Sequence, residues 1–411
     1  MSGLRTPITL SVIKHLATIY KVMEMMMSVT DLNIQLASAI KQHMPPGFSV
    51  KALHEPCLRG NESRYVQECI DTNWVSSLGK FVDRFEEKLA EYTGARYAIA
   101  TVNGTAALHI AYQLAGVRAD DEVLLPSVTF IATANAVRYC DAIPHFVDTG
   151  VNHPNVCPQK LKDYLNDIAE IKSGVCYNKK TGRVIRALCV VHILGHPADL
   201  DEIKNICEHY HLTMIEDASE ALGSFYKGTH VGHAGLMGTL SFNGNKIVTT
   251  GGGGALLTND PDIASRAKHL TTTGKVPRHR EMVYDCVAYN YRLPNINAAM
   301  GCAQLETLPN FLAKKRELLR CYQAAVAEID HVELLVEPDN THSNYWLHAL
   351  VLDRDDRDDV LAALHQEGID AWPIWQLIHT LPMYQHCPQM NLNNSEQWMS
   401  RLIRLPSGVS F

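Results

Sequence analysis

The chain has 411 residues, of which 46% are hydrophobic and 20% are charged, and its formal net charge is −7. This composition is typical of a soluble globular protein with a large core and, at this length, two domains. The acidic balance provides no overall basic field, so we expect no nucleic-acid partner.

The cysteines and histidines do not indicate a metal or disulfide framework. The 11 cysteines occur singly, without a CxxC pair, which favours reduced thiols and a cytoplasmic location. No HExxH motif is present, and Gly195 and Pro197 disfavour a helix that would bring His192 and His196 together. We therefore expect no metal site.

Residues 1–50 are predicted to form an N-terminal helical extension. The apolar stretch 8–27 is interrupted by charged residues and is followed by no small-residue cleavage site, so neither a membrane span nor a signal peptide is expected. Leu32, Leu36 and Ile40 then repeat at helical spacing before Pro45-Pro46-Gly47 ends the pattern. We expect no membrane partner.

Residues 51–310 are predicted to form a large domain. A core-facing helix is expected where Phe81, Phe85 and Leu89 repeat at helical spacing. Apolar strands are expected at 97–102, 122–125, 143–147, 184–192 and 213–217. The strands alternate with helices of about a dozen residues, which favours an α/β fold with a mainly parallel sheet and helices on both faces.

Two strand ends in this domain carry motifs that suit a ligand. After the strand at 97–102, Gly104 allows a tight turn, and the amides of Thr105 and Ala106 would point outward at a helix start, where phosphate binds readily. A capped helix without a ligand is the alternative. Phe130 follows the next strand and could stack on a planar cofactor, although core packing is the commoner role of such a residue.

Lys246 is the residue around which the candidate chemistry is built. It lies between Ser241 and a glycine run at 251–254, and the strand ending at Asp217 precedes it. An amine that can lose its proton suits a Schiff base to pyridoxal 5′-phosphate (PLP), and a carboxylate suits the pyridine nitrogen of that cofactor. The glycines either form a hairpin turn or make room for the cofactor, and they do not match the dinucleotide fingerprint GxGxxG.

Residues 311–411 are predicted to form a smaller α+β domain. A long helix is expected at 312–329, a strand near 347–351 and a helix at 358–367, followed by a loop rich in tryptophan and proline. The preceding Ala-rich segment, 296–305, is predicted as a separate helix that ends before Pro309.

Taken together, the motifs resemble the DegT/DnrJ/EryC1/StrS family of PLP-dependent nucleotide-sugar aminotransferases. Five stretches carry the resemblance in family order: Asn103 to Leu108, Pro126 to Phe130, Glu216 to Ala218, Ser241 to Lys246 and Tyr289 to Leu293. Further stretches resemble the LegC-type subgroup: Leu53 to Pro56, Trp74 to Lys80, Pro373 to Trp375 and Leu381 to Tyr384.

The resemblance implies a fold-type I aminotransferase, a homodimer whose active sites are shared between subunits. The implied reaction moves an amino group from L-glutamate to C4 of a UDP-4-keto-6-deoxy-N-acetylhexosamine, on the way to legionaminic acid or bacillosamine sugars of surface polysaccharides. Lys246 and Asp217 are the implied catalytic residues. The implied cofactor-binding residues are Gly104, Thr105, Ala106, Phe130, Asp217, Glu220, Ser241, Asn243, Lys246 and, from the other subunit, Asn290.

Two positions depart from the family pattern. Glu220 stands where many members have Gln or His beside the ring oxygen of the cofactor, and a second carboxylate there would alter local proton affinities unless it faces substrate. Trp372 stands where an arginine is expected before the Pro-x-Trp segment, which leaves the contact to the sugar or its diphosphate unassigned.

Three alternatives remain open at this point. A PLP-dependent sugar dehydratase of the same family would have a histidine in place of Lys246, so Lys246 disfavours it. The presence of Asp217, Lys246 and Asn290 disfavours a non-catalytic regulatory homologue, whereas the change at Trp372 on the substrate side leaves that alternative open. An aminotransferase acting on a cyclitol or another keto sugar would share every motif above.

Overall fold

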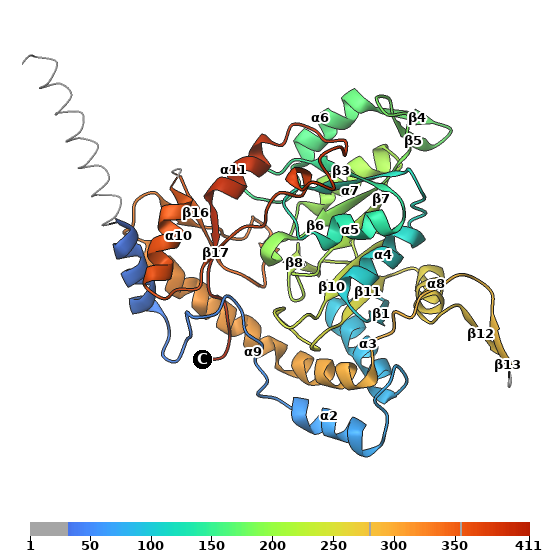
Figure 1. Cartoon of the computed structure of the whole chain (residues 1–411), viewed down its shortest axis with the longest axis horizontal. Helices are drawn as coiled ribbons and strands as arrows, with labels where there is room; N and C mark the ends of the chain where they lie inside the picture. The colour runs from blue at the N-terminus through green and yellow to red at the C-terminus, as the bar shows by residue number, and fades with distance from the viewer. Residues whose placement is uncertain (1–31, 279–280, 354–355) are drawn as a thin grey trace, which may run out of the picture.

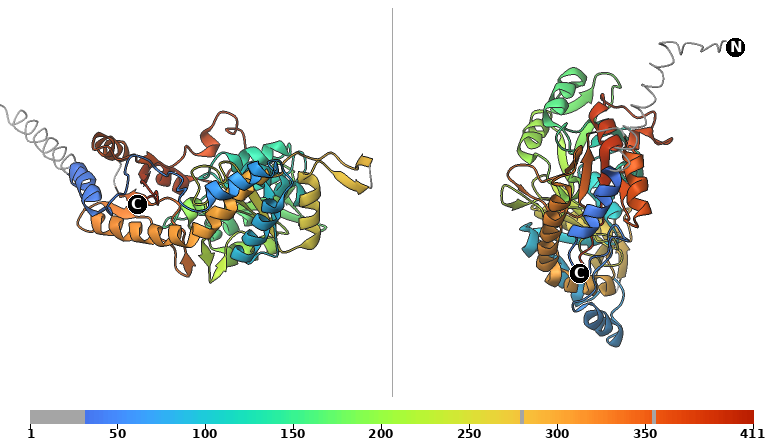
Figure 2. Two further views of the ribbon diagram at one scale, coloured as in Figure 1. Left: turned by 90° about the horizontal axis from the view of Figure 1, so that it is seen from below. Right: turned by 90° about the vertical axis from the view of Figure 1, so that its left-hand side faces the viewer.

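The computed structural model describes residues 32–278, 281–353 and 356–411, and the predicted helix within residues 8–27 lies outside them. Within the described residues, no helix is both long and apolar enough to cross a bilayer. The helix at 32–43 buries Leu36 and Ile40 against C-terminal residues such as Tyr322 and Leu364, and Figures 1 and 2 show it beside α10.

A seven-stranded sheet forms the centre of the molecule, in the order β1-β11-β10-β7-β6-β2-β3 (Figure 1). Its strands are β1 (Tyr97–Thr101), β2 (Glu122–Pro126), β3 (Ile143–Val147), β6 (Ile185–Val191), β7 (Thr213–Asp217), β10 (Met237–Ser241) and β11 (Gly254–Thr258). Only β11 runs antiparallel to its neighbours β1 and β10; the other pairs are parallel. The mainly parallel sheet predicted from the strand and helix alternation is confirmed.

Both faces of the sheet are buried. Successive strand residues belong to two different core clusters, with Leu124 and Leu257 on one face and Leu125 and Leu256 on the other. This arrangement explains why the strands read as continuous apolar runs. One cluster contains residues of α3 (Lys80–Thr93), α6 (Pro158–Ile168) and α7 (Leu200–His209), and the other those of α4 (Gly104–Leu114), α5 (Ala132–Tyr139) and α8 (Pro261–Thr271).

The C-terminal region has a four-stranded antiparallel sheet in the order β14-β16-β18-β17. Its elements are β14 (Val332–Leu334), β16 (Ala349–Leu352), α10 (Arg357–Gln366), β17 (Trp372–Pro373), η2 (Ile378–Thr380), α11 (Asn393–Arg401) and β18 (Leu402–Arg404). The remaining elements are short or peripheral: α2 (Glu62–Asp71), β4 (Ala169–Lys172), β5 (Val175–Asn178), η1 (Ile193–Gly195), β8 (Phe225–Tyr226), β9 (Thr229–His230), β12 (Lys275–Arg278), β13 (Glu281–Tyr284) and β15 (Thr341–His342). The β12–β13 hairpin stands away from the rest of the molecule (Figure 2).

One helix, α9 (Asn295–Val326), replaces the two helices predicted on either side of Pro309. Proline lacks an amide hydrogen and disfavours a helix interior. The apolar stripe nevertheless continues through it, because Leu305, Leu308 and Phe311 are all buried in one core cluster. Tertiary packing therefore overrides the local signal. The predicted domain boundary at residue 310 falls inside α9, and the division into domains stays a prediction.

Candidate active site

A cavity of about 410 Å³ lies at the carboxyl ends of the central strands, where open α/β sheets place ligands. Residues from strand ends and from α4 and α5 form one part of its lining, which we call the strand-end wall: Gly104, Thr105, Phe130, Thr133, Asp217 and Ser241. Residues from the C-terminal region and the segment before α2 form a second part, the C-terminal wall: Leu53, His54, Trp346, Leu347, Trp375 and Arg404. Lys246, Glu220 and Asn243 also line it.

The amine of Lys246 lies inside this cavity. A turn after β10, closed by a hydrogen bond from the Lys246 amide to the Asn243 carbonyl at 3.0 Å, carries the side chain, which is 13% exposed. Nζ lies 3.3 Å from Oε1 of Glu220 and 3.9 Å from the centre of the Trp346 ring. The indole Nε1 of Trp346 donates to the Asn245 carbonyl at 2.7 Å, so the ring is fixed beside the amine.

Asp217 is held in one orientation by its neighbours. As the last residue of β7 it is 5% exposed, its Oδ2 accepts from the Thr133 hydroxyl at 2.8 Å, and its Oδ1 accepts from the Ser219 amide at 3.1 Å. The Thr133 hydroxyl also contacts that of Thr129 at 2.9 Å. A buried carboxylate fixed in this way suits a permanent cationic partner in the cavity.

The N-terminus of α4 lies against the end of β10 and the start of β11. A Cβ on Gly104 would lie 2.9 Å from Cβ of Ser241, and one on Gly254 would lie 2.5 Å from the Asn103 carbonyl, so both positions need glycine. Oδ1 of Asn103 accepts from the Ala106 amide at 2.8 Å, which occupies one of the two amides expected to bind phosphate. The Thr105 amide has no acceptor within the described part of the chain.

Glu220 joins Lys246 to the backbone around it. It is 6% exposed, and its Oε2 accepts from the amide of Leu194 at 2.9 Å. Burial raises the pKa of Glu220, and the charge of Lys246 partly offsets this effect. The departure from the family pattern at this position therefore places a carboxylate next to the lysine.

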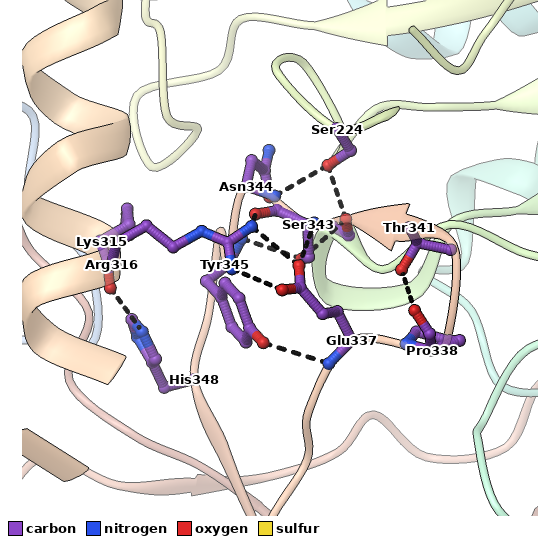
Figure 3. A network of polar contacts seen from close by, with 11 residues as sticks. Ser224, Lys315, Arg316, Glu337, Pro338, Thr341, Ser343, Asn344, Tyr345 and His348 are labelled. Atoms are coloured by element: carbon purple, nitrogen blue, oxygen red, sulfur yellow. Dashed lines mark hydrogen bonds and ion pairs between the residues drawn. The ribbon is translucent and has the colours of Figure 1, made fainter. Parts of the chain in front are cut away.

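A buried polar network links Glu220 to the C-terminal wall, and Figure 3 shows the neighbouring part of this network around Arg316, Glu337 and Asn344. The Asn344 amide nitrogen donates to the carbonyls of Glu220 at 2.8 Å and Leu222 at 2.9 Å, and its Oδ1 accepts from the Trp346 backbone amide at 2.8 Å. Nearby, Arg316 pairs with Glu337 through two hydrogen bonds of 2.6 and 2.7 Å. The segment that carries Trp346 is thus tied to the segment that carries Glu220.

His54 has no protein partner for its imidazole. Both ring nitrogens are buried, and neither forms a hydrogen bond within the described residues. Burial, then the charges of Lys315 and Lys246, hold the pKa of His54 well below its usual value, so the ring is neutral at pH 7. An unpartnered polar group that lines a cavity is suited to contact a ligand.

The structure brings most of the predicted site residues together, but not all of them. Eight line the cavity: Gly104, Thr105, Phe130, Asp217, Glu220, Ser241, Asn243 and Lys246. Ala106 and Asn290 do not; Asn290 is exposed and forms a bridge with Thr272. Trp372 is also outside the lining, and its Nε1 donates to Asp370 at 2.8 Å.

Several lining residues were given no role by the sequence analysis. Thr133, Trp346 and Arg404 were not singled out, and His54 and Trp375 were noted only within longer motifs. An arginine within the apolar run from Leu402 to Leu405 was the one local signal that could have indicated Arg404. The two histidines considered as metal ligands have different surroundings: His192 hydrogen-bonds Glu216 at 3.1 Å, whereas neither ring nitrogen of His196 has a hydrogen-bond partner in the described chain.

Comparison with known proteins gives consistent matches over most of the chain. The model of the DegT/DnrJ/EryC1/StrS aminotransferase family matches residues 56–411. GDP-perosamine synthase of Vibrio cholerae is 36% identical over 361 residues, which cover 86% of this chain and 93% of the relative. A Bacillus subtilis (strain 168) protein, provisionally named pyridoxal phosphate-dependent aminotransferase EpsN, is 37% identical over 365 residues, covering 87% and 90%.

A solved structure matches over a similar share of the chain. The crystal structure of a DegT DnrJ EryC1 StrS aminotransferase from Brucella abortus superposes with a TM-score of 0.77 at 27% identity, covering 85% of this chain and 90% of that one. The central sheet and the C-terminal antiparallel sheet therefore belong to one known arrangement.

Proposed function

Because the chain belongs to the DegT/DnrJ/EryC1/StrS family and is a PLP-dependent sugar aminotransferase of fold type I, we propose that it aminates C4 of a nucleotide-linked keto sugar. The proposed amino donor is L-glutamate, and the proposed acceptor is a UDP-4-keto-6-deoxy-N-acetylhexosamine. The observation that supports this most is that an amine, Lys246, and a fixed carboxylate, Asp217, line the same cavity.

The lining residues fit PLP. Lys246 would hold the cofactor covalently, Asp217 would face its ring nitrogen, and Phe130 would stack on its ring. The remaining contacts would come from Gly104, Thr105 and Ser241 to the phosphate, with Glu220 beside the ring oxygen and Asn243 nearby. When bound, the cofactor supplies a protonated ring that takes up the electron pair released at the substrate carbon.

The chain's own residues would move the protons. Nζ of Lys246 would take a proton from the α-carbon of the donor and later deliver one to the sugar carbon that receives the amine. Glu220, 3.3 Å from Nζ, would hold the amine within reach of both carbons. Asp217, fixed by Thr133 and Ser219, would direct its carboxylate at the cofactor's ring nitrogen.

The nucleotide of the acceptor has two candidates. The stretches Leu53 to Pro56 and Trp74 to Lys80 resemble the LegC-type subgroup and favour UDP, whereas a relative named GDP-perosamine synthase favours GDP. We propose the UDP sugar first and the GDP sugar second. The resulting amino sugar would serve surface polysaccharides.

We also propose that the active protein is a cytoplasmic homodimer. All 11 cysteines are free. Asn290 is exposed, so Asn290 of the partner subunit could complete each site. Exposed apolar side chains between α2 and α3, namely Trp74, Val75 and Leu78, offer a surface for a second copy.

The experiment measures 2-oxoglutarate formed from L-glutamate with a panel of keto sugars. The panel contains UDP-linked and GDP-linked 4-keto-6-deoxy sugars and a keto cyclitol, and mass spectrometry identifies the aminated product. We expect turnover with a nucleotide sugar, fastest with UDP. Turnover with the cyclitol alone would overturn the proposal that the acceptor is a nucleotide sugar. If the PLP-loaded protein turned over no member of the panel, the non-catalytic alternative would be supported.

A further inference from the structure

Arg404 presents a guanidinium group to the cavity and forms no ion pair with any residue that the structure describes. Its Nε donates to the Pro373 carbonyl at 2.9 Å, and its guanidinium carbon lies 4.9 Å from the centre of the Trp375 ring. These two contacts orient the group. Its terminal nitrogens, Nη1 and Nη2, have no hydrogen bond or ion pair within the described part of the chain.

The charge of Arg404 is retained at neutral pH. Burial lowers its pKa to about 10, and the charge of Glu220 acts in the opposite direction. A partly buried cation without a counter-ion costs free energy, and a guanidinium with two free nitrogens binds a carboxylate or phosphate through paired hydrogen bonds. The geometry therefore favours an anionic ligand at this position.

Arg404 also accounts for the arginine that is absent from position 372. Trp372 of the edge strand β17 is the direct cross-strand partner of Arg404 on β18. Directly opposed residues of an antiparallel pair project from the same face of the sheet. A cation expected on β17 is thus provided on the same face by the neighbouring strand, while Trp372 remains half exposed and bonded to Asp370.

We propose that Arg404 binds an oxyanion of the substrates, either the carboxylate of the amino donor or the diphosphate of the sugar nucleotide, through Nη1 and Nη2. The inference rests on the proposed aminotransferase reaction. It assigns to this chain a specificity residue that lies on a different strand from the expected one.

The test measures ligand binding to the PLP-loaded protein by titration calorimetry, with 2-oxoglutarate in one arm and UDP and GDP in the other. In Arg404→Gln we expect the affinity for one of the two classes to fall about tenfold or more, because charge-assisted hydrogen bonds are lost. The affinity for the other class and the visible absorbance of the bound cofactor should not change. KM for the affected substrate should rise more than kcat falls.

Three further variants separate binding from a structural role. Arg401→Gln removes a nearby arginine that does not line the cavity and should bind both ligand classes normally. Arg404→Lys keeps the charge without the paired geometry, so it should bind the affected ligand class more weakly than the wild type does. This variant keeps the inference testable if Arg404→Gln fails to fold. Adding Trp372→Arg to Arg404→Gln should restore at least part of the lost affinity.

Unchanged affinity for both ligand classes in Arg404→Gln, with cofactor bound, would overturn the inference but leave the proposed function standing. Loss of cofactor in Arg404→Gln and Arg404→Lys, but not in Arg401→Gln, would also overturn it. No rescue by Trp372→Arg would overturn the relation between the two positions. If the wild-type protein binds neither 2-oxoglutarate nor a nucleotide, the proposed function fails together with the inference.

Discussion

The two walls of the cavity differ in how far the protein satisfies the ionisable side chains that line them. On the strand-end wall, Asp217 is bonded to Thr133 and to the Ser219 amide. On the C-terminal wall, both nitrogens of His54 and the terminal nitrogens of Arg404 lack partners within the described residues. One wall is therefore prepared in advance for a resident group, and the other is completed by ligands that come and go.

This difference has an energetic meaning. Groups held by hydrogen bonds before binding lose little freedom when a ligand arrives, so they can impose a geometry on the ligand. Unpartnered buried groups raise the free energy of the empty cavity, and a ligand that satisfies them gains what the protein alone lacks. Substitutions on the two walls should accordingly affect cofactor retention and substrate affinity separately.

The largest effect is expected for Lys246→Ala, which removes the amine between the two walls. Turnover should fall by about 10³-fold or more, because both the covalent anchor and the proton carrier are lost. Assays of 2-oxoglutarate release measure turnover, and visible absorbance spectra of the purified protein measure the bound cofactor. Lys204→Ala, at an exposed position on α7, is the matched control. If Lys246→Ala retained the visible absorbance of the bound cofactor and its turnover, Lys246 would be neither the covalent anchor nor the proton carrier.

The second effect concerns the strand-end wall alone. Asp217→Asn keeps the shape but removes the charge that would face the cofactor's ring nitrogen, so we expect turnover to fall by about 10²-fold and cofactor affinity to fall with it. Binding of 2-oxoglutarate to the fully loaded variant should remain near the wild-type value. A selective loss of substrate affinity would mean that the walls do not divide as described.

A pH-dependent prediction concerns the support beneath the strand-end wall. Burial would raise the pKa of Glu216, but hydrogen bonds from His192 and from the amides of Gly235 and Gly232 outweigh burial and lower it. A carboxyl with a lowered folded-state pKa stabilises the protein above its unfolded value of 4.5, and this contribution disappears as the pH falls through the folded value.

Glu216→Gln should therefore lower the free energy of unfolding at pH 7 by about 3 kcal/mol, since it breaks a buried charged network. Denaturant titrations of the two proteins between pH 7 and pH 3 provide the measurement. The difference between them should shrink as the pH decreases below 4.5. A difference that grows toward acid pH would contradict the assigned direction of the shift.

The link between the C-terminal wall and the Glu220 segment should contribute less stability than the Glu216 network. Asn344→Ala leaves the Glu220 and Leu222 carbonyls and the Trp346 amide without their partners, at a cost of about 2 kcal/mol in unfolding free energy. The tryptophan fluorescence of the protein should also change, because the Trp346 backbone loses its bond to Asn344 and its ring can move relative to Lys246. An unaltered spectrum together with unaltered stability would show that the C-terminal wall is positioned independently of Asn344.

The smallest effect is expected for His54→Ala, which removes an unpartnered group from the C-terminal wall. No protein hydrogen bond is lost in the described chain, so stability should change little. KM for a substrate should rise about fivefold, which corresponds to one hydrogen bond of about 1 kcal/mol. Steady-state kinetics at saturating cofactor measure it. Cofactor loss in place of a KM change would assign His54 to the other wall.

The same division explains what could be read from the sequence. The strand-end residues occur in short motifs directly after apolar strands, and parallel strand ends converge at one edge of a sheet, so Thr105, Asp217 and Lys246 were predictable as one group. The C-terminal wall draws on His54, Trp346 and Arg404, which are far apart in the chain. Their meeting depends on antiparallel register and on side-chain networks, which carry no local signal.

Two local rules failed for a related reason. Pro309 predicted a break, but the buried stripe on both sides keeps α9 continuous. The amide of Ala106 looked available for phosphate, but the Asn103 side chain caps the helix through it. In both places a contact that the sequence pattern cannot specify decided between two allowed structures.

The continuity of α9 has a consequence for how the protein melts. Near the start of the helix, Asn297 donates to the Thr250 carbonyl at 2.7 Å, and Lys315, about five turns further along, donates to the Trp346 carbonyl at 2.7 Å. Because one uninterrupted helix contacts both the loop that leads into β11 of the central sheet and the segment of the C-terminal wall that carries Trp346, heating should produce one cooperative heat-absorption peak for the described fold instead of two independent ones.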